Sequence, residues 1–296
     1  MILYARMLEF KMFRPEDALT LKPFFNKIDT YCYEYNLSYL LLWREVEDIH
    51  YAITADDELF IWQKASKSFL LPLSDDIPSS IEKLYSFCKE VNVPFFLKSV
   101  PAEALSFFSS DYTVEHDRDL DDYLYTPEKL IGLHGKHLQA KRNHISQFEK
   151  GYTFTVEKLN RESERECIEM DNHWTALHEE FSQEVQEEKM AIVNSFKFWD
   201  ELNLKGLALR IDGKIAAFTI GEIVREGKEA IVHFEKGDIN YMGIYAAINN
   251  LFCKEYLENV TYIDRQEDVG IEGLRKSKLS YHPDSMAEKY RVCRAL

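Results

Sequence analysis

The chain has 296 residues, with 51 acidic and 36 basic side chains that give a formal net charge of −15 at pH 7. Hydrophobic residues make up 46% of the chain, so a packed core is expected and intrinsic disorder is excluded. Because such a charge repels nucleic acid and anionic lipid over most of the surface, a polyanionic partner would need a local basic patch.

The sequence shows no membrane span, signal peptide or paired cysteines, and these features bear on the expected compartment and solubility. The strongest apolar run, residues 39–43, is far shorter than a membrane span, and charged residues interrupt the N-terminus before a signal peptide could form. The five cysteines are scattered and never form a C-x-x-C pair, as is typical of free thiols in a reducing compartment. We therefore expect a soluble, cytoplasmic protein without an integral membrane segment.

The predicted elements follow a similar order in the two halves. Those of the first half are a helix at 15–28, strands at 39–43, 50–54, 59–63 and 69–71, a helix at 80–91, a strand at 95–100 and a short helix after Pro101. Those of the second half are a long helix within 125–150, a strand at 154–157, helices at 164–177 and 184–202, strands at 206–211, 214–223 and 230–235, a helix at 244–257, a strand at 260–263, a helix at 271–279 and a strand at 287–292.

This order predicts two α/β (α+β) domains, each with a mixed, mostly antiparallel sheet flanked by helices. We place them at residues 1–125 and 126–296, with a basic linker helix at 126–150 in the second domain. The order in the second half resembles the acyl-CoA N-acyltransferase (GNAT) fold. All eleven glycines lie at or beyond Gly132, so a loop that holds a cofactor phosphate is expected in the second half.

The linker helix is the candidate basic patch. No acidic residue occurs from residue 129 to residue 148, and Lys141, Arg142 and Asn143 suit phosphate oxygens. The alternative is an ordinary solvated face of a helix. His134 and His137 are three residues apart, but no third ligand is in sight, so no metal site is predicted.

A second candidate is the connection between the strand at 230–235 and the following helix. Glu235 and His233 alternate onto one face of that strand, which suits acid–base chemistry. The loop and helix start could cradle an anion through main-chain N–H groups, and an ordinary strand–helix turn is the alternative. The candidate cofactor-binding residues are Gly237, Asp238, Gly243, Ile244 and Tyr245.

The third candidate is a dense cluster of both charge signs after a short strand, at residues 264–278. Open α/β sheets place their sites at such strand ends. Glu267 and Asp268 are the candidate acids, and Arg265, Arg275 and Lys278 are the candidate cations. The alternative is a structural ion-pair network that holds the last helix against the sheet.

At these residues the sequence resembles the C-terminal domain of bacterial phosphatidylglycerol lysyltransferases, a family with many stand-alone members of unknown function. The resembling stretches are residues 141–148, 212–222, 233–238, 243–249 and 262–281. The resemblance implies tandem GNAT-like domains and kinship with enzymes that move an aminoacyl group from a charged tRNA to an amine or hydroxyl. It implies that Lys141 and Arg142 bind donor phosphates, that Arg265, Arg275 and Lys278 complete a basic wall, and that Glu235 or Glu267 acts as base.

The chain departs from these relatives in two ways. It lacks their membrane-embedded part, which puts a lipid acceptor in doubt. It also lacks the R-x-x-G-x-G/A signature of coenzyme A-using enzymes, since residues 240–244 read N-Y-M-G-I. The expected function is therefore aminoacyl transfer from aminoacyl-tRNA to a small-molecule, peptide or lipid acceptor. An acetyl-CoA-dependent or other acyl-CoA-dependent N-acyltransferase and a non-catalytic binding module are the alternatives.

Overall fold

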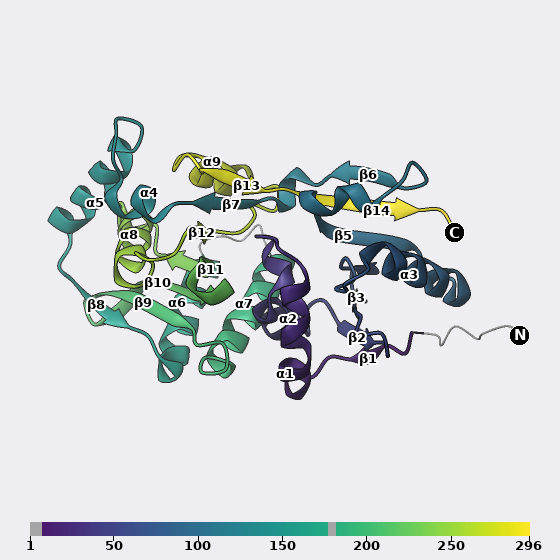
Figure 1. The fold of residues 1–296 in the computed structure, drawn as a ribbon. Helices are drawn as coiled ribbons and strands as arrows, with labels where there is room; N and C mark the ends of the chain where they lie inside the picture. The colour runs from purple at the N-terminus through teal and green to yellow at the C-terminus, as the bar shows by residue number, and fades with distance from the viewer. Residues whose placement is uncertain (1–7, 177–181) are drawn as a thin grey trace, which may run out of the picture. The chain divides into compact units, whose positions relative to one another are not determined.

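The computed structural model describes residues 8–176 and 182–296, which form two compact units (Figure 1). Unit 1 comprises the described residues up to Asp122 together with Ala287–Leu296, and unit 2 comprises Tyr123–Met286. Each unit has its own seven-stranded sheet with helices packed on it.

In unit 1 the strand order is β1-β2-β3-β4-β5-β14-β6, and the pairs are antiparallel except for β4 with β5. Its strands are β1 (Lys11–Met12), β2 (Ile49–Ile53), β3 (Leu59–Gln63), β4 (Ser68–Phe69), β5 (Phe95–Pro101), β6 (Thr113–His116) and β14 (Lys289–Arg294). Its helices are α1 (Ala18–Leu21), α2 (Leu37–Trp43) and α3 (Ile77–Val91), and its 3-10 turns are η1 (Pro15–Asp17), η2 (Lys22–Lys27), η3 (Tyr33–Tyr35), η4 (Ala102–Phe107) and η5 (Arg118–Leu120).

In unit 2 the strand order is β13-β7-β12-β11-β10-β9-β8, in which β11 and β12 run parallel. Its strands are β7 (Asp122–Tyr125), β8 (Phe154–Lys158), β9 (Lys205–Ile211), β10 (Lys214–Val224), β11 (Glu229–Gly237), β12 (Tyr262–Asp264) and β13 (Ser285–Ala287). Its helices are α4 (Pro127–Gly132), α5 (Gln139–Gly151), α6 (Glu164–Ala176), α7 (Ser182–Lys197), α8 (Ile244–Tyr256) and α9 (Glu272–Leu279), with 3-10 turns η6 (Arg161–Ser163) and η7 (Arg225–Gly227).

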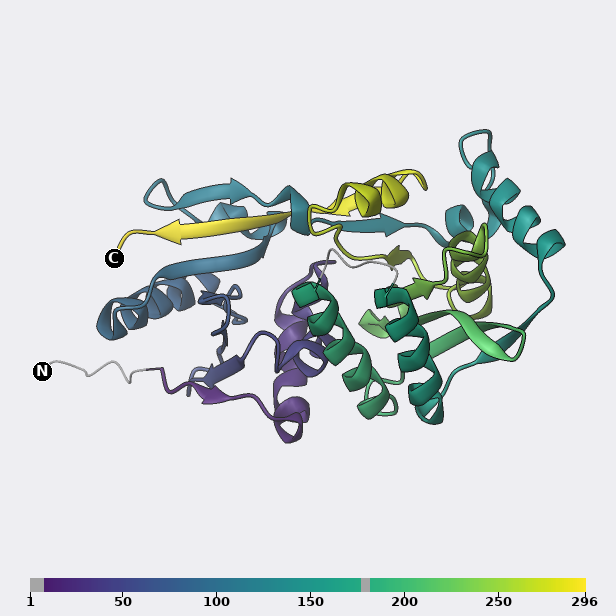
Figure 2. The same cartoon turned by 180° about the vertical axis from the view of Figure 1, so that it is seen from behind.

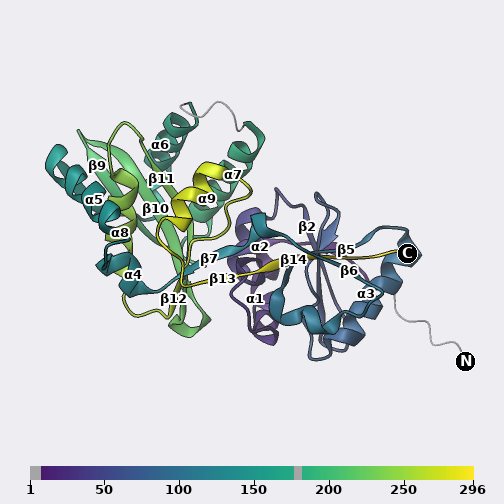
Figure 3. The same ribbon diagram turned by 90° about the horizontal axis from the view of Figure 1, so that it is seen from above.

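The helices of unit 2 cover both faces of its sheet. Figure 3 shows α8 with α4 and α5 on one side of the central strands and α6 with α7 on the other. Figure 2 shows α6 and α7 side by side. The apolar side of α8, with Ile244, Ile248 and Phe252 fully buried, packs on β9, β10 and β11 and forms the centre of the core. The predicted architecture of mostly antiparallel sheets flanked by helices is confirmed.

Local sequence signals account for the well-predicted elements. Asp76 caps α3 by accepting a hydrogen bond from the Ser79 N–H at 3.1 Å, and Asn92 ends the helix in a left-handed conformation with φ 54°. The predicted two-residue turn joins β9 to β10 at Asp212 and Gly213, both with positive φ, as such hairpins require. Residue 177, the expected end of the helix that begins at Glu164, lies outside the described residues.

Three predicted elements differ from the structure. The helix predicted at 15–28 is the short α1 between the 3-10 turns η1 and η2. Residues 39–43, predicted as a strand, belong to α2, because a short run buried on every side carries no periodicity that separates helix from strand. The single linker helix is two helices, α4 and α5. The chain turns between them through Leu133 (φ 48°) and Gly135 (φ 85°), and Arg142 Nη1 donates to the carbonyl oxygens of both residues.

The last strand also differs from the expected domain assignment, which placed residues 287–296 in the second domain. Instead, β14 lies between β5 and β6 of unit 1, and the fully buried Lys289 ammonium contacts Glu34 Oε2 at 2.7 Å and Asp122 Oδ2 at 2.8 Å. Because these partners lie more than 160 positions away in sequence, neither periodicity nor composition could place the strand.

The buried ion triad generates a stability prediction. Replacing Lys289 by Met leaves the carboxylates of Glu34 and Asp122 buried without their cation, so we expect the free energy of unfolding to fall by about 3–5 kcal/mol in urea titrations. The exposed Lys22, changed to Met, should shift it by less than about 0.5 kcal/mol. Equal urea midpoints for the two variants would contradict a structural role for the triad.

Candidate functional site

The strongest candidate site lies in unit 2, where β11 and β12 stop pairing. β12 pairs with β11 only over Glu229–Ile231, and β11 then continues for six residues to Gly237. Beyond that point, side chains from the segment after β12 contact the side chains of β11. Arg265 and Gln266 both take part, and this brings two of the sequence-predicted clusters together.

Glu235 is held by two partners at this opening. Its Oε1 accepts from Arg265 Nη2 at 2.8 Å, and its Oε2 accepts from Asn249 Nδ2 of α8 at 2.9 Å. The side chains of Glu235 and Arg265 are only 13% and 9% exposed, so the ion pair is largely removed from water. Although burial lowers the pKa of Arg265, the carboxylate of Glu235 raises it above its usual range. The pair is therefore a fixed, oriented carboxylate–guanidinium unit.

Lys141 completes this group from the side of α5. Its Nζ lies 3.9 Å from the ring centroid of the buried Tyr281, and the guanidinium carbon of Arg265 lies 4.9 Å from the same centroid. Burial and the charge of Arg265 lower the pKa of Lys141 to about 8, while Glu235 acts in the opposite direction. Two predicted substrate-binding cations thus share one aromatic ring, beside the predicted base.

His233 is buried and hydrogen-bonded rather than exposed. Its side chain is 1% exposed, with Nε2 3.1 Å from Glu222 Oε1 and Nδ1 3.2 Å from Gln266 Nε2. An amide N–H donates to Nδ1, so the ring proton lies on Nε2 and points to Glu222. With both nitrogens engaged, His233 orients Gln266 beside the ion pair.

The C-terminal charge cluster is mostly a structural network in the described residues. Arg275 donates to both oxygens of the fully buried Asp268, at 2.9 and 2.7 Å, and the hydroxyl of Tyr123 donates to Oδ2 at 2.5 Å. Although burial raises the pKa of Asp268, these hydrogen bonds lower it overall. Its oxygens are thus occupied, as the structural alternative for this segment requires.

Lys278 serves the same network. Its ammonium donates to the carbonyl oxygens of Arg265, Gln266 (3.0 Å) and Glu267 (2.7 Å), and the residue is only 7% exposed. The Gln266 carbonyl also accepts from the Tyr123 N–H of β7 at 3.4 Å, and Lys278 supplies a charged donor to all three carbonyls. Glu267, by contrast, has a buried Oε2 without a hydrogen-bond partner in the described structure.

The loop before α8 is close-packed. A Cβ on Gly243, where φ is 85°, would lie 2.1 Å from the His144 carbonyl oxygen of α5, so only glycine fits there. The N–H groups of Asp238, Tyr241, Met242 and Ile244 all donate to acceptors of the chain itself. Most donors that an anion would use are therefore occupied in this loop.

The remaining predicted residues are spread around this loop and α5. Tyr245 accepts a hydrogen bond from Trp174 Nε1 at 2.8 Å, and Asp238 lies 3.1 Å from His173 Nε2. Arg142 is exposed but holds the turn between α4 and α5, and the neighbouring Asn143 is exposed. The structure thus brings Lys141, Glu235 and Arg265 together and separates them from the other cations.

Sequence reasoning missed a second polar cluster on the opposite face of β11. Lys236 is 3% exposed, lies 3.6 Å from the Trp174 ring centroid and contacts Glu188 at 2.5 Å. Alternation along the strand places it opposite Glu235, which was the available signal. It also missed Asn249 and Gln266, whose roles depend on contacts between separate elements.

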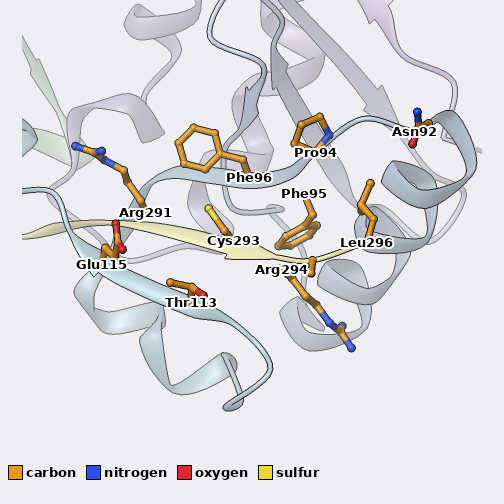
Figure 4. Close-up of a pocket in the computed structure, with 11 residues that line it drawn as sticks. Asn92, Pro94, Phe95, Phe96, Thr113, Glu115, Arg291, Cys293, Arg294 and Leu296 are labelled. Carbon is orange, nitrogen blue, oxygen red and sulfur yellow. The ribbon is translucent and has the colours of Figure 1, made fainter.

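A pocket of about 760 Å³ lies elsewhere, in unit 1 (Figure 4). It is formed by β5, β6, β14 and the chain end, and it is lined by Asn92, Pro94, Phe95, Phe96, Thr113, Glu115, Arg291, Cys293, Arg294, Ala295 and Leu296. None of the predicted site residues lines it. A pocket without converging polar or charged side chains is weaker evidence for a functional site than the charged group on β11. We therefore place the candidate site in unit 2.

The described residues contain neither a metal-binding cluster nor a membrane-spanning helix. Within residues 8–176 and 182–296, no group of three or more His, Cys, Asp or Glu side chains is arranged to hold a metal ion. Over the same part of the chain, no helix has both the length and the apolar character needed to cross a bilayer.

The role assigned to Lys278 can be measured. Lys278→Met should lower the free energy of unfolding by about 3 kcal/mol, because buried carbonyl oxygens lose a charged donor. The matched control is Lys276→Met, since Lys276 is an exposed residue of the same helix. If both variants unfold at the wild-type urea midpoint, Lys278 does not support the segment after β12.

Comparison with solved structures shows how widely this fold occurs. A conserved protein of unknown function from Bacteroides thetaiotaomicron VPI-5482 is 31% identical, with a TM-score of 0.88 over 98% of this chain and 100% of that one. L-PGS from Bacillus licheniformis is 18% identical, with a TM-score of 0.67 over 96% and 93%. A GNAT-family acetyltransferase from Colwellia psychrerythraea is 9% identical, with a TM-score of 0.50 over 96% and 98%, which agrees with the predicted GNAT-like fold.

Comparison of sequences gives the family. An uncharacterised protein from Mycoplasmoides gallisepticum is 29% identical over 192 residues, or 64% of this chain, and the chain covers 61% of that relative's length. The model of the family described as phosphatidylglycerol lysyltransferase, C-terminal, matches residues 25–293, which is nearly the whole chain. The chain therefore belongs to the phosphatidylglycerol lysyltransferase C-terminal family, on an acyltransferase-type fold.

Proposed function

We propose that this chain transfers an aminoacyl group from aminoacyl-tRNA to an amine or hydroxyl of a small-molecule, peptide or lipid acceptor, at the opening between β11 and β12. The observation that carries the proposal is the Glu235–Arg265 pair with Lys141 beside it. Family membership supplies the reaction class, because the family's description names the C-terminal part of a lysyltransferase.

The three side chains match the needs of direct acyl transfer. Glu235 takes the proton of the attacking amine or hydroxyl, and the new bond forms between that atom and the ester carbonyl carbon. Arg265 stabilises the negative charge that develops on the carbonyl oxygen. The ester bond to the ribose then breaks, and the leaving 3′-oxygen receives the proton from Glu235. No covalent enzyme intermediate is needed.

Lys141, the exposed side of α5 and the turn before that helix supply cations for the donor's phosphates. Lys136, Arg142 and Lys150 are exposed, and no acidic residue lies between residues 129 and 148. In a chain of net charge −15, this local patch is where a polyanion meets the least repulsion. Lys141, half-buried behind them, is placed to contact a phosphate near the reacting ester.

An acyl-CoA donor is the alternative, and the loop before α8 gives it weaker support. Its diphosphate would use Gly237, Asp238 and the first residues of α8, yet most N–H groups of that loop already have acceptors and Asp238 adds a negative charge. The aminoacyl-tRNA donor is therefore the proposal that the charge distribution favours.

The test is single-turnover transfer from tRNAs charged with each amino acid to hydroxylamine and to small amines as acceptors. Glu235→Gln should slow transfer by about 10²–10⁴-fold, because the general base is lost while the shape is kept. Glu149→Gln on the exposed side of α5 is the matched control and should transfer at the wild-type rate. Circular dichroism checks that both variants are folded.

Three outcomes would contradict the proposal. Equal rates for Glu235→Gln and wild type would remove Glu235 as the base. Consumption of acetyl-CoA but of no aminoacyl-tRNA would favour the acyl-CoA alternative. Tight binding of a donor without transfer to any acceptor would favour a non-catalytic binding module.

Salt dependence gives a second prediction. Affinity for aminoacyl-tRNA should fall steeply with salt, and Lys136→Ala should reduce the slope of log affinity against log salt by about 1, because one phosphate contact is lost. Lys22→Ala in unit 1 should leave the slope unchanged. Fluorescence anisotropy between about 50 and 200 mM salt measures it, and a salt-independent affinity would rule out this surface as the tRNA contact.

A further inference from the structure

Lys141 differs from Lys150, the other lysine of α5, in its surroundings. It is half-buried, while Lys150 of the same helix is exposed. Its ammonium lies 3.9 Å from the centroid of Tyr281, a residue that is only 4% exposed. One side of the ammonium is therefore covered by an aromatic ring, which displaces water from it while the face of the ring attracts the cation.

In the described part of the chain, Lys141 has no ion pair to offset that loss of solvent, although the charge of Glu235 favours its protonated form. Within the described residues, Lys141 makes no ion pair and donates no hydrogen bond. The nearby carboxylate of Glu235 is already held by Arg265 and Asn249. The closest fixed charge against the same ring is the guanidinium of Arg265, which repels an ammonium.

Partial burial and a neighbouring cation both favour the neutral amine of a lysine, and the neutral amine is the nucleophile. Burial, together with Arg265, lowers the pKa of Lys141 to about 8. A substantial fraction of Lys141 is then unprotonated near neutral pH, whereas an ordinary exposed lysine is almost fully charged.

We propose that Lys141 is a nucleophilic lysine and a site of covalent acylation by activated acyl esters. The neutral Nζ attacks the ester carbonyl carbon, an amide bond forms to Nζ, and the carbon–oxygen bond of the ester breaks. One proton leaves Nζ and is taken up by the leaving oxygen, so the products are an acyl-lysine and an alcohol. No oxidant, reductant or further reactant is required.

Acylation would also regulate the site. An acyl-lysine carries no charge, so the modified chain loses one of the cations that the proposed donor needs. This consequence for transfer rests on the proposed function, whereas the reactivity of Lys141 rests only on the surroundings of its side chain. An activated ester that reaches the site without an acceptor would then switch the site off.

The experiment is competitive labelling of the folded full chain with less than one equivalent of N-hydroxysuccinimidyl acetate, followed by peptide mass spectrometry. At pH 7.5, Lys141 should be labelled about 10-fold faster than Lys150, because its larger neutral fraction outweighs its lower basicity. The rate at Lys141 should rise with pH and level off above a midpoint near 8. Lys150, on the same helix and exposed, should keep rising to about pH 10.

Two variants sharpen the result. Lys141→Arg keeps the charge and removes the nucleophile, so the fast-labelled peptide should disappear while other lysines are unaffected. Arg265→Gln removes the repelling cation and leaves Glu235 uncompensated, so the midpoint at Lys141 should move upward and labelling at pH 7.5 should slow. Circular dichroism confirms folding.

The proposal is overturned if Lys141 is labelled no faster than Lys150, or if its labelling midpoint lies near that of an exposed lysine. Since the reagent is a synthetic ester, neither result depends on whether the chain uses aminoacyl-tRNA. Fast labelling combined with no transfer from any aminoacyl-tRNA would support the reactive lysine and count against the proposed function alone.

Discussion

The candidate site depends on a single constraint, the early end of β12. Parallel pairing with β11 stops at Ile231, so the second half of β11 has no strand beside it on that edge. Side chains then occupy the edge that a neighbouring strand would have covered. Arg265 and Gln266, the first residues after β12, do so by contacting Glu235 and His233. A buried ion pair is possible here only because the sheet is open.

The segment after β12 no longer pairs with β11, although its backbone keeps two hydrogen bonds with Tyr123 of β7. The carbonyl oxygens of Arg265, Gln266 and Glu267 need donors, and the Lys278 ammonium supplies them. Asp268 turns the chain into α9 and is fixed by Arg275 and by Tyr123. These charged residues therefore act on the site indirectly, by fixing the backbone from which Arg265 extends. In this sequence, a dense cluster of charges therefore contains both residues of the site and residues that only support it.

The sequence predicted the charged stretch at residues 262–281 as functional but could not divide it into roles. Strand alternation placed Glu235 correctly, because periodicity is a local property. That Glu235 meets Arg265 and Asn249 depends on contacts among β11, α8 and the segment after β12, which no local pattern encodes. The same limit explains β14, whose partners lie far along the chain, and α2, whose apolar run at residues 39–43 fits either a strand or a helix.

The two cations beside Glu235 differ in whether they form an ion pair. Arg265 has a carboxylate partner and is held in place, whereas Lys141 has none within the described residues. A cation that is already paired must lose its partner before it can bind a phosphate, and that loss weakens binding. A partly buried lysine without an ion pair avoids the loss, but it gives up its proton more readily than an exposed lysine does. An arriving phosphate would favour the protonated form, so the same unmatched charge that prepares Lys141 to bind an anion also makes it reactive when the anion is absent.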